Sequence, residues 1–394
     1  METQAHNQEI ISEKLNYIAP TYGSRGIEIN KGKGIFLYDT LGNKYFDCFS
    51  NYGVNILGHN NERLNNAIYD QLGKLTNLHG SFENEIRDRF SKMLVEKSPD
   101  NLKSVFYANS GAEAIEAAIK FAILTTGKNG IIAAKMGYHG KTTGALSLTK
   151  TLPKYNKPFE SILHEAKHMS FNDADSLKEL IDENTAAVFL EPIQGESGIR
   201  IPDKEFFINI RKICDEHNIL LVIDEIQTGM GRTGKLFAIE HFGIQPDMMC
   251  LAKGLAAGLP IGAVLVSEKV SESMFGGCHT NTFGGNPLVC RAGIETLNYI
   301  EENNILENSR EVGNYFIEKL REIDSPVVRE IRGMGLMIAI ELKSRVTRYA
   351  KELQDGGIIT IPTGSNVIRL LPPLILSKEN VDSMIPVFRD VLSR

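Results

Sequence analysis

Apolar runs that end in a polar residue and then break into glycine or serine recur from about residue 100 onward. Most of these runs are separated by stretches whose apolar residues recur at helical spacing. Short continuous apolar runs are typical of strands buried on both faces, and their alternation with helices predicts a mainly parallel sheet covered on both sides. The expected fold class is therefore α/β. The predicted strands are Ser104–Asn109, Ile131–Lys135, Ala187–Glu191, Leu220–Glu225, Met248–Lys253 and Gly262–Ser267.

The chain on either side of this alternation has different patterns. Residues 1 to about 30 begin as a polar stretch that predicts a helical arm, and Ile27–Asp47 predicts a hairpin around the turn residues 39–43. An amphipathic helix is expected at Glu62–Leu75. Beyond residue 290 we expect a helix from Glu295 to Leu320, a strand Gly335–Glu341, a second helix ending at Gly356-Gly357, two short strands Ile358–Ile361 and Asn366–Leu371, and a last helix capped by Ser377.

These patterns divide the chain into three parts. Residues 1–55 are expected to form an arm and a hairpin that pack with the small domain. Residues 56–290 are expected to form a large domain with the parallel sheet and the binding site, and residues 291–394 a smaller α+β domain. Since there is no internal repeat or low-complexity linker, we expect these parts to pack closely.

Composition narrows the class of function. The formal net charge is −6 and no long block of lysine or arginine occurs, which argues against a nucleic-acid surface and favours small-molecule chemistry. The first residues, Met1–Asn7, are polar and acidic, and no apolar run approaches the roughly 18 residues of a membrane helix, so we expect a cytoplasmic protein without a membrane partner. Five cysteines without a C-x-x-C pair indicate reduced thiols.

Polar residues gather where the predicted strands end, which in a parallel sheet is one edge. Asp224 and Lys253 follow neighbouring apolar runs, so this edge receives an acid and a primary amine. Such a pair suits a pyridine aldehyde, because the amine forms an imine and the acid keeps the ring nitrogen protonated as an electron acceptor. The predicted cofactor is pyridoxal 5'-phosphate. On these two runs alone, a structural Asp–Lys pair is the alternative.

The phosphate of such a cofactor needs an anchor, and Ser110-Gly111-Ala112 offers one. A hydroxyl and two backbone N–H groups open the predicted helix Glu113–Phe121 at its positive end. Taken alone, Ser110 is better explained as an ordinary helix cap. Its place on the same edge as Asp224 and Lys253 favours the phosphate site.

Two motifs point to other chemistry and are weaker. His164–His168 fits H-E-x-x-H, but the following Met169–Phe171 predicts a short strand instead of the helix that a zinc pair requires, so no metal site is expected. Gly229–Gly234 fits G-x-G-x-x-G, but the strand ends several residues earlier and no second strand with a ribose-binding acid follows at the expected distance. Nucleotide binding is therefore not expected.

With these residues in view, the chain resembles the class III, pyridoxal-phosphate-dependent aminotransferases, and within them the acetylornithine/ornithine group. The resemblance implies a fold-type I transferase whose large domain binds the cofactor. It covers nearly the whole chain and rests on Leu57–His59, Asn109–Ala114, Glu191–Glu196, Asp224–Gly234, Ala252–Gly254, Thr282–Pro287 and Ile368–Pro373. The family carries a glycine-rich turn at Gly229–Gly234 that binds no dinucleotide, which accounts for that motif.

The resemblance assigns the cofactor contacts. Lys253 resembles the lysine that joins the cofactor and then moves the proton between substrate and cofactor, and Asp224 the acid that pairs with the pyridinium nitrogen. Gln227 would bond the ring hydroxyl side, and Tyr138 would stack on the ring face with His139 beside it. These roles agree with the chemistry expected from the residues themselves.

The phosphate contacts implied by the resemblance come from two subunits. Ser110, Gly111 and Ala112 would hold the phosphate together with Thr282 of the partner subunit. A site shared in this way implies an obligate homodimer.

The resemblance also assigns the substrate contacts. Arg369 resembles the arginine that clamps the α-carboxylate of glutamate or 2-oxoglutarate, a bidentate task suited to guanidinium. Glu196 resembles the gate that pairs with this arginine when the other amine donor is bound. The expected reaction moves a terminal (omega) amino group from an acetylornithine- or ornithine-like donor to 2-oxoglutarate, giving a semialdehyde and glutamate by a ping-pong mechanism.

One departure leaves the donor open. Where the acetylornithine and ornithine enzymes usually have an arginine for the donor's carboxylate, this chain has Lys141, a point charge without a fork. Putrescine (diamine) aminotransferases resemble the chain at this position. A lysine-biosynthetic relative that acts on a carrier-protein-linked amino group resembles it at Asn51–Val54 and Gly144–Ser147. An aminomutase on the same fold is the remaining enzymatic alternative, and a non-enzymatic binding protein has no need of Lys253 beside Asp224.

Overall fold

A seven-stranded sheet forms the centre of the computed structural model, which describes residues 17–394. Strand β10 runs antiparallel to β4 and β9, while the remaining neighbours in the sheet pair in parallel. The α/β fold with a mainly parallel sheet is thus confirmed. In spatial order the strands are β4 (Leu102–Ala108), β10 (Gly262–Ser267), β9 (Met248–Leu251), β8 (Leu220–Asp224), β7 (Thr185–Leu190), β5 (Gly130–Ala134) and β6 (Ala166–Met169).

The sheet is buried on both faces because its strands are apolar at every position. In β8, Leu220 and Val222 pack with helix α5 (Gly111–Thr126), whereas Leu221 and Ile223 pack with helix α9 (Lys204–His217) on the other side. Side chains alternate between the two faces of a strand, so this pattern directs Asp224 toward the α5 side. The strand pattern therefore delivers one acid to the face that also carries the start of α5.

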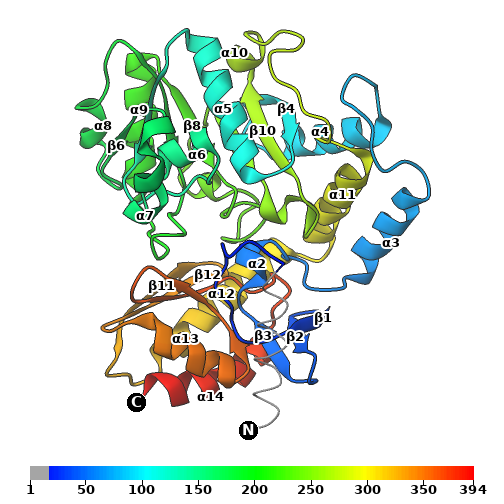
Figure 1. Cartoon of the computed structure of the whole chain (residues 1–394), viewed down its shortest axis with the longest axis vertical. Helices are drawn as coiled ribbons and strands as arrows, with labels where there is room; N and C mark the ends of the chain where they lie inside the picture. Colours follow the sequence, from blue (N-terminus) through cyan, green and yellow to red (C-terminus); the bar gives the residue numbers. More distant parts are fainter. Residues whose placement is uncertain (1–16) are drawn as a thin grey trace.

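Two smaller sheets lie beyond the central one (Figure 1). The first joins both parts of the chain, because the N-terminal strand β3 pairs in parallel with β13 near the C-terminus. The second is antiparallel throughout. Their strands are β1 (Ile29–Lys33), β2 (Phe36–Asp39), β3 (Lys44–Asp47) and β13 (Ile358–Ile359), and then β11 (Val328–Met334), β12 (Met337–Leu342), β15 (Val367–Leu370) and β14 (Ile361–Thr363).

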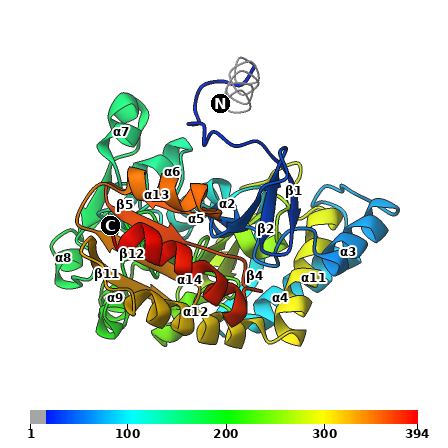
Figure 2. The same cartoon turned by 90° about the horizontal axis from the view of Figure 1, so that it is seen from below.

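Helices α12 (Ile305–Arg321) and α14 (Lys378–Leu392) pack against each other beside the small sheets (Figure 2). Figure 1 shows them with α13 and β1–β3 below the large sheet. We keep 55/56 and 290/291 as proposed domain boundaries. The other helices are α2 (Ser50–Gly53), α3 (Glu62–Leu72), α4 (Glu85–Lys97), α6 (Thr143–Leu148), α7 (Pro153–Asn156), α8 (Asp175–Lys178), α10 (Glu268–Ser271), α11 (Pro287–Glu302) and α13 (Val346–Asp355), with 3-10 turns η1 (Lys157–Ile162), η2 (Ala238–His241) and η3 (Lys253–Ala256).

Several sequence expectations outside the central sheet were wrong. The single helix expected at Glu295–Leu320 is two helices, α11 and α12, because Asn304 adopts the left-handed conformation (φ 51°) between them. The strand expected from Gly335 begins at β12 instead, since Gly335 (φ 55°) makes the turn that follows β11. The strand expected at Ile358–Ile361 splits into β13 and β14, which belong to different sheets.

The expected N-terminal arm lies mostly outside the described residues, which exclude residues 1–16. Residues 17–28 contain no helix. Within residues 17–394, no helix has the length and apolar character needed to cross a membrane. The five cysteine thiols are free, and all but the half-buried Cys278 are buried.

Candidate active site

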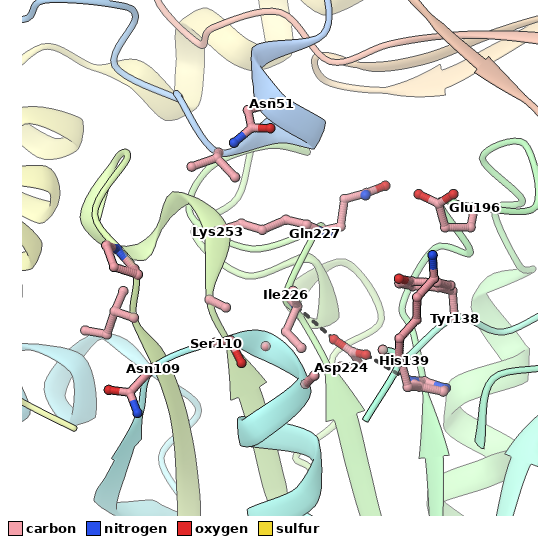
Figure 3. Close-up of a pocket in the computed structure, with 18 of the residues that line it drawn as sticks. Asn51, Asn109, Ser110, Tyr138, His139, Glu196, Asp224, Ile226, Gln227 and Lys253 are labelled. Atoms are coloured by element: carbon pink, nitrogen blue, oxygen red, sulfur yellow. Dashed lines mark hydrogen bonds and ion pairs between the residues drawn. The ribbon is translucent and has the colours of Figure 1, made fainter. Parts of the chain in front are cut away.

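A cavity of about 440 Å³ opens at the carboxyl edge of the central sheet, where the sequence placed its polar residues. Figure 3 shows the side chains gathered around it, with a dashed line joining Asp224 to His139. Thr282 and Arg369 are the two expected site residues that do not line the cavity. The ten that do are Ser110, Gly111, Ala112, Tyr138, His139, Lys141, Glu196, Asp224, Gln227 and Lys253.

Asp224 closes strand β8 with its carboxylate buried beside His139. The two carboxylate oxygens have separate partners: Oδ2 lies 2.7 Å from Nδ1 of His139, and Oδ1 accepts the backbone N–H of Ile226 at 3.0 Å. Burial acts to lower the pKa of His139, but its hydrogen bond to Asp224 and the charge of that carboxylate outweigh burial and raise the pKa. The pair is therefore a buried carboxylate held in place by the neighbouring imidazole.

Lys253 follows strand β9 and begins the turn η3. Its backbone adopts φ 46°, a conformation that costs a non-glycine residue about 1–3 kcal/mol and is found most often at functional sites. Burial of the amine lowers the pKa of Lys253, although the charges of Glu196 and Asp224 oppose this shift. The neutral amine, which is the form that accepts a proton, thus forms more readily than in a solvated lysine.

The N-terminus of α5 forms one end of the cavity. Ser110 caps the helix, and its Oγ accepts the N–H of Glu113 at 3.3 Å. The first N–H groups of a helix have no partner within the helix, so those of Gly111 and Ala112 are available to an anion. A Cβ at Gly111 would lie 2.9 Å from Cδ1 of Ile226, which shows how tightly this turn packs beside the cavity.

Arg369 lies beside the cavity on strand β15, fully buried, and its guanidinium is shared between two acceptors. Nη2 donates to Oε1 of Glu196 at 2.7 Å, and Nη1 donates to Oε1 of Gln227 at 2.9 Å. Burial acts to raise the pKa of Glu196, but the charge and hydrogen bond of Arg369 lower it. Because Nε has no partner, the guanidinium retains a free donor. Tyr52 lies over it, with the ring centroid 5.7 Å from Cζ.

Lys141 and Tyr138 lie on the loop that follows β5. Lys141 is exposed, and its Nζ lies 4.6 Å from the ring centroid of Tyr155. Tyr138 is half-buried, and burial together with the charge of Glu196 raises its pKa to about 12, so the ring stays neutral.

Thr282 lies on an exposed loop between α10 and α11, away from the residues that line the cavity. Its role toward a partner subunit stays a prediction.

The sequence analysis missed two parts of the site. Glu191, at the end of the third predicted strand, is buried next to the cavity and accepts two backbone N–H groups. The available signal was the charged end of an apolar run, as for Asp224. Three consecutive non-glycine residues, Ser50, Asn51 and Tyr52, have φ between 43° and 60°, and Asn51 lines the cavity. The sequence did not predict this left-handed turn, because glycine is the residue that adopts positive φ without steric cost and none of these three residues is glycine.

The two motifs that pointed to zinc or nucleotide chemistry do not have the local structure that such chemistry needs. Residues 166–168 of the H-E-x-x-H match lie in β6, which is a strand and not the helix that the motif needs. In residues 17–394, no cluster of three or more His, Cys, Asp or Glu side chains could hold a metal ion. The glycine-rich turn 229–234 encloses its own Arg232, which is buried and donates to the carbonyls of Leu336 and Pro372.

Known proteins match this chain over nearly its full length. The family model described as aminotransferase class-III matches residues 17–392. An acetylornithine aminotransferase of Methanosarcina mazei is 39% identical over 98% of this chain and 96% of its own. A [LysW]-aminoadipate semialdehyde transaminase of Deinococcus radiodurans is 40% identical over 97% and 90%. The ornithine aminotransferase structure from Toxoplasma gondii, which holds PLP at partial occupancy, superposes with a TM-score of 0.93 at 30% identity, covering 98% and 94%.

Proposed function

Because this chain belongs to the class III aminotransferases, which are pyridoxal-phosphate-dependent enzymes, we propose that it moves a terminal amino group from an acetylornithine- or ornithine-like donor to 2-oxoglutarate. The products are a semialdehyde and glutamate. The observation that carries the proposal is the ion pair between the buried Arg369 and the half-buried Glu196 beside the cavity, since it offers a carboxylate clamp with a displaceable partner.

The residues around the cavity fit the cofactor. When bound, pyridoxal phosphate supplies an aldehyde and a ring that accepts electrons. The N–H groups at the start of α5 suit its phosphate, the Asp224 carboxylate suits its ring nitrogen, and the Lys253 amine suits its aldehyde. These three features line one cavity of a size suited to a small molecule.

Lys253 and Asp224 carry the proton chemistry in this proposal. The amine of Lys253, with its lowered pKa, would take a proton from the substrate carbon and pass it to the cofactor. Asp224, oriented by His139, would hold a proton on the ring nitrogen of the bound cofactor. The half-buried ring of Tyr138 covers one side of the cavity and limits the access of water.

Arg369 and Glu196 separate the two halves of the reaction. In the structure Glu196 occupies one fork of the guanidinium, which suits a donor that brings no carboxylate to this end. When 2-oxoglutarate or glutamate enters, its α-carboxylate replaces Glu196 and gains a bidentate contact. One arginine thus serves two substrates of different charge.

The choice of donor depends on Lys141 and on the related proteins. Lys141 offers a single positive charge at the mouth of the cavity, stacked on Tyr155. Acetylornithine and ornithine are the favoured donors because related proteins are named for them. A carrier-bound amino group is the second candidate, because another relative is a [LysW]-aminoadipate semialdehyde transaminase. Putrescine is a third, and an aminomutase is disfavoured by the buried clamp of Arg369.

We also propose a homodimer in which Thr282 contributes to the phosphate site of the other subunit. Arg87 ties two loops together by donating to the carbonyls of Phe82 and Gly285, and these loops expose Phe82 (61%) and Phe283 (57%). Aromatic side chains this exposed are typical of interface surfaces. Sedimentation equilibrium measures the mass directly, and a monomer would contradict the proposal.

The donor assignment is tested by incubating the holoenzyme with acetylornithine, ornithine, putrescine and lysine, each with 2-oxoglutarate, and measuring glutamate. We expect acetylornithine or ornithine to give the highest kcat/KM. In Lys141→Arg the forked guanidinium should raise kcat/KM for these two amino acids, relative to that for putrescine, by about tenfold. This is the value of one charge-assisted hydrogen bond. An unchanged ranking would leave Lys141 as a solvated loop residue, and no glutamate from any donor would contradict the proposed acceptor.

Arg369→Lys is expected to raise the KM for 2-oxoglutarate and glutamate by roughly 10- to 100-fold, because one ammonium cannot replace the two-pronged contact. The donor half-reaction should change much less, since the donor does not use the clamp. Single-turnover kinetics separate the two halves, because in a ping-pong scheme each substrate meets the enzyme alone. Equal losses in both halves would show that Arg369 is not specific to the acceptor.

A further inference from the structure

Glu191 stands directly after strand β7, beside the strand that carries Asp224. Leu190 pairs with Ile223 in the sheet, so the next residue of each strand, Glu191 and Asp224, emerges at the same edge. Glu191 is 7% exposed and lines the cavity. Since an unpaired buried carboxylate is costly, its hydrogen-bond partners should reveal what keeps it there.

The two oxygens of Glu191 accept N–H groups from two different loops. Oε1 accepts the N–H of Tyr138 at 2.9 Å, in the loop after β5, and Oε2 accepts the N–H of Gly195 at 3.2 Å, in the loop after β7. A Cβ on Gly195 would collide with Oε1 of Gln227, so this backbone fits against the cavity side chains. One side chain therefore ties together two segments that are 57 residues apart in sequence.

These two segments carry two side chains that line the cavity, Tyr138 and Glu196. Tyr138 supplies the ring that covers the cavity, while Gly195 immediately precedes Glu196, the partner of Arg369. A shift of about 1 Å in either segment would misplace a ring or an ion pair, and such errors are costly in catalysis.

The charges that act on Glu191 come from the ends of two other strands, β5 and β8. Burial raises its pKa to about 7, the charge of His139 lowers it, and the charge of Asp224 raises it. The anchoring contacts themselves are hydrogen bonds to neutral backbone groups.

We propose that Glu191 is a positioning residue that fixes the cavity-covering ring of Tyr138 and the gate Glu196 at the same time. The inference rests on the proposed function, because it assigns those two side chains to the cofactor face and to the acceptor clamp. It implies that a change at Glu191 affects both half-reactions, in contrast to Arg369, whose loss affects only one.

The test is Glu191→Gln in the holoenzyme, because the amide keeps the volume but has one oxygen in place of two. Its NH₂ group cannot accept an N–H, so one loop loses its anchor. We expect both single-turnover half-reactions to slow by roughly 10- to 100-fold. The visible circular dichroism of the bound cofactor should also change, because this signal reports how the ring lies against its neighbours.

Glu225→Gln is the matched control. Glu225 is equally buried, its pKa is likewise raised by burial to about 7, and it also accepts a backbone N–H, that of Ile239 at 2.7 Å. Its contacts hold Thr228 and the turn η2, away from the cavity. The control should lose thermal stability much as Glu191→Gln does, while its visible dichroism and both half-reaction rates stay within about twofold of the wild type.

If both variants change dichroism and rates alike, the effect is a general consequence of losing a buried acid and the proposal is overturned. It is also overturned if Glu191→Gln keeps the wild-type dichroism and both rates. Should Glu191→Gln not fold, Glu191→Asp replaces it, since the shorter carboxylate keeps the charge but cannot reach both N–H groups. If the wild type does not use 2-oxoglutarate, the proposed function fails, and the dichroism comparison still decides the role of Glu191.

Discussion

Lys253→Ala is expected to bind pyridoxal phosphate and yet to lose turnover by roughly 10⁴-fold, the upper end of what a positioned proton-transfer group contributes. The phosphate end of the cavity and Asp224 remain in this variant, so cofactor binding should persist. The amine that lies within the cavity with a lowered pKa is removed, and no other group described there replaces it. A small primary amine added to the solution should restore part of the activity by entering the space that the side chain vacates.

The covalent partner of the cofactor can be identified directly. Lys253 and Lys141 are the two lysines that line the cavity, so borohydride treatment followed by peptide mapping has two possible outcomes there. We expect the reduced adduct on Lys253 in the wild type and in Lys141→Ala, and no adduct in Lys253→Ala. An adduct on Lys141 would overturn the assignment of the site.

Asp224→Asn is expected to lower turnover by roughly 10²–10³-fold, the usual loss when one preorganised electrostatic contact to the reacting group is removed. A neutral amide cannot hold a proton on the ring nitrogen, and it also leaves His139 without its anionic partner 2.7 Å away. Cofactor affinity should fall much less, because the N–H groups at the start of α5, which we propose hold the phosphate, are unchanged. Absorbance titration measures cofactor binding, and single-turnover rates measure the chemistry.

Asp247→Asn is a suitable control for Asp224→Asn. Asp247 lies just before β9 at the opposite edge of the same sheet, where its carboxylate accepts the N–H of Leu221 and pairs with Arg211. Its loss should lower stability and leave turnover per folded molecule unchanged. Near-normal turnover in Asp224→Asn, or an equal loss in Asp247→Asn, would count against the proposed role of Asp224.

The parts of the site that could be predicted are those that a local pattern produces. Asp224 and Lys253 end apolar runs. A strand that is buried on both faces is apolar at every position, so such a run can be recognised from the sequence. Ser110 could be predicted because a cap followed by a helix is also local. For these positions the sequence pattern and the final geometry have the same physical cause.

The remaining parts depend on contacts between distant segments. The left-handed turn at Ser50–Tyr52 is one of these parts, because three consecutive non-glycine residues do not favour that conformation on their own. The contact between Arg369 and Gln227 joins residues 142 positions apart, which no local pattern encodes. Glu191 could have been predicted as a site residue because it ends an apolar run. Its two contacts depend on two loops that are distant in sequence, so no local pattern predicts them.

The pairing of β3 with β13 has a consequence for biosynthesis. Residues 46 and 47 are made early, but their partners, residues 358 and 359, leave the ribosome more than 300 residues later. At about 5–20 residues per second this is a wait of roughly 15 to 60 seconds. The turn that carries Asn51 is bracketed by the same late segments, since Cys48 bonds Ile359 and Leu371 and Ile56 bonds Leu374. The wall of the cavity that carries Asn51 can therefore be completed only after residue 374 has been made.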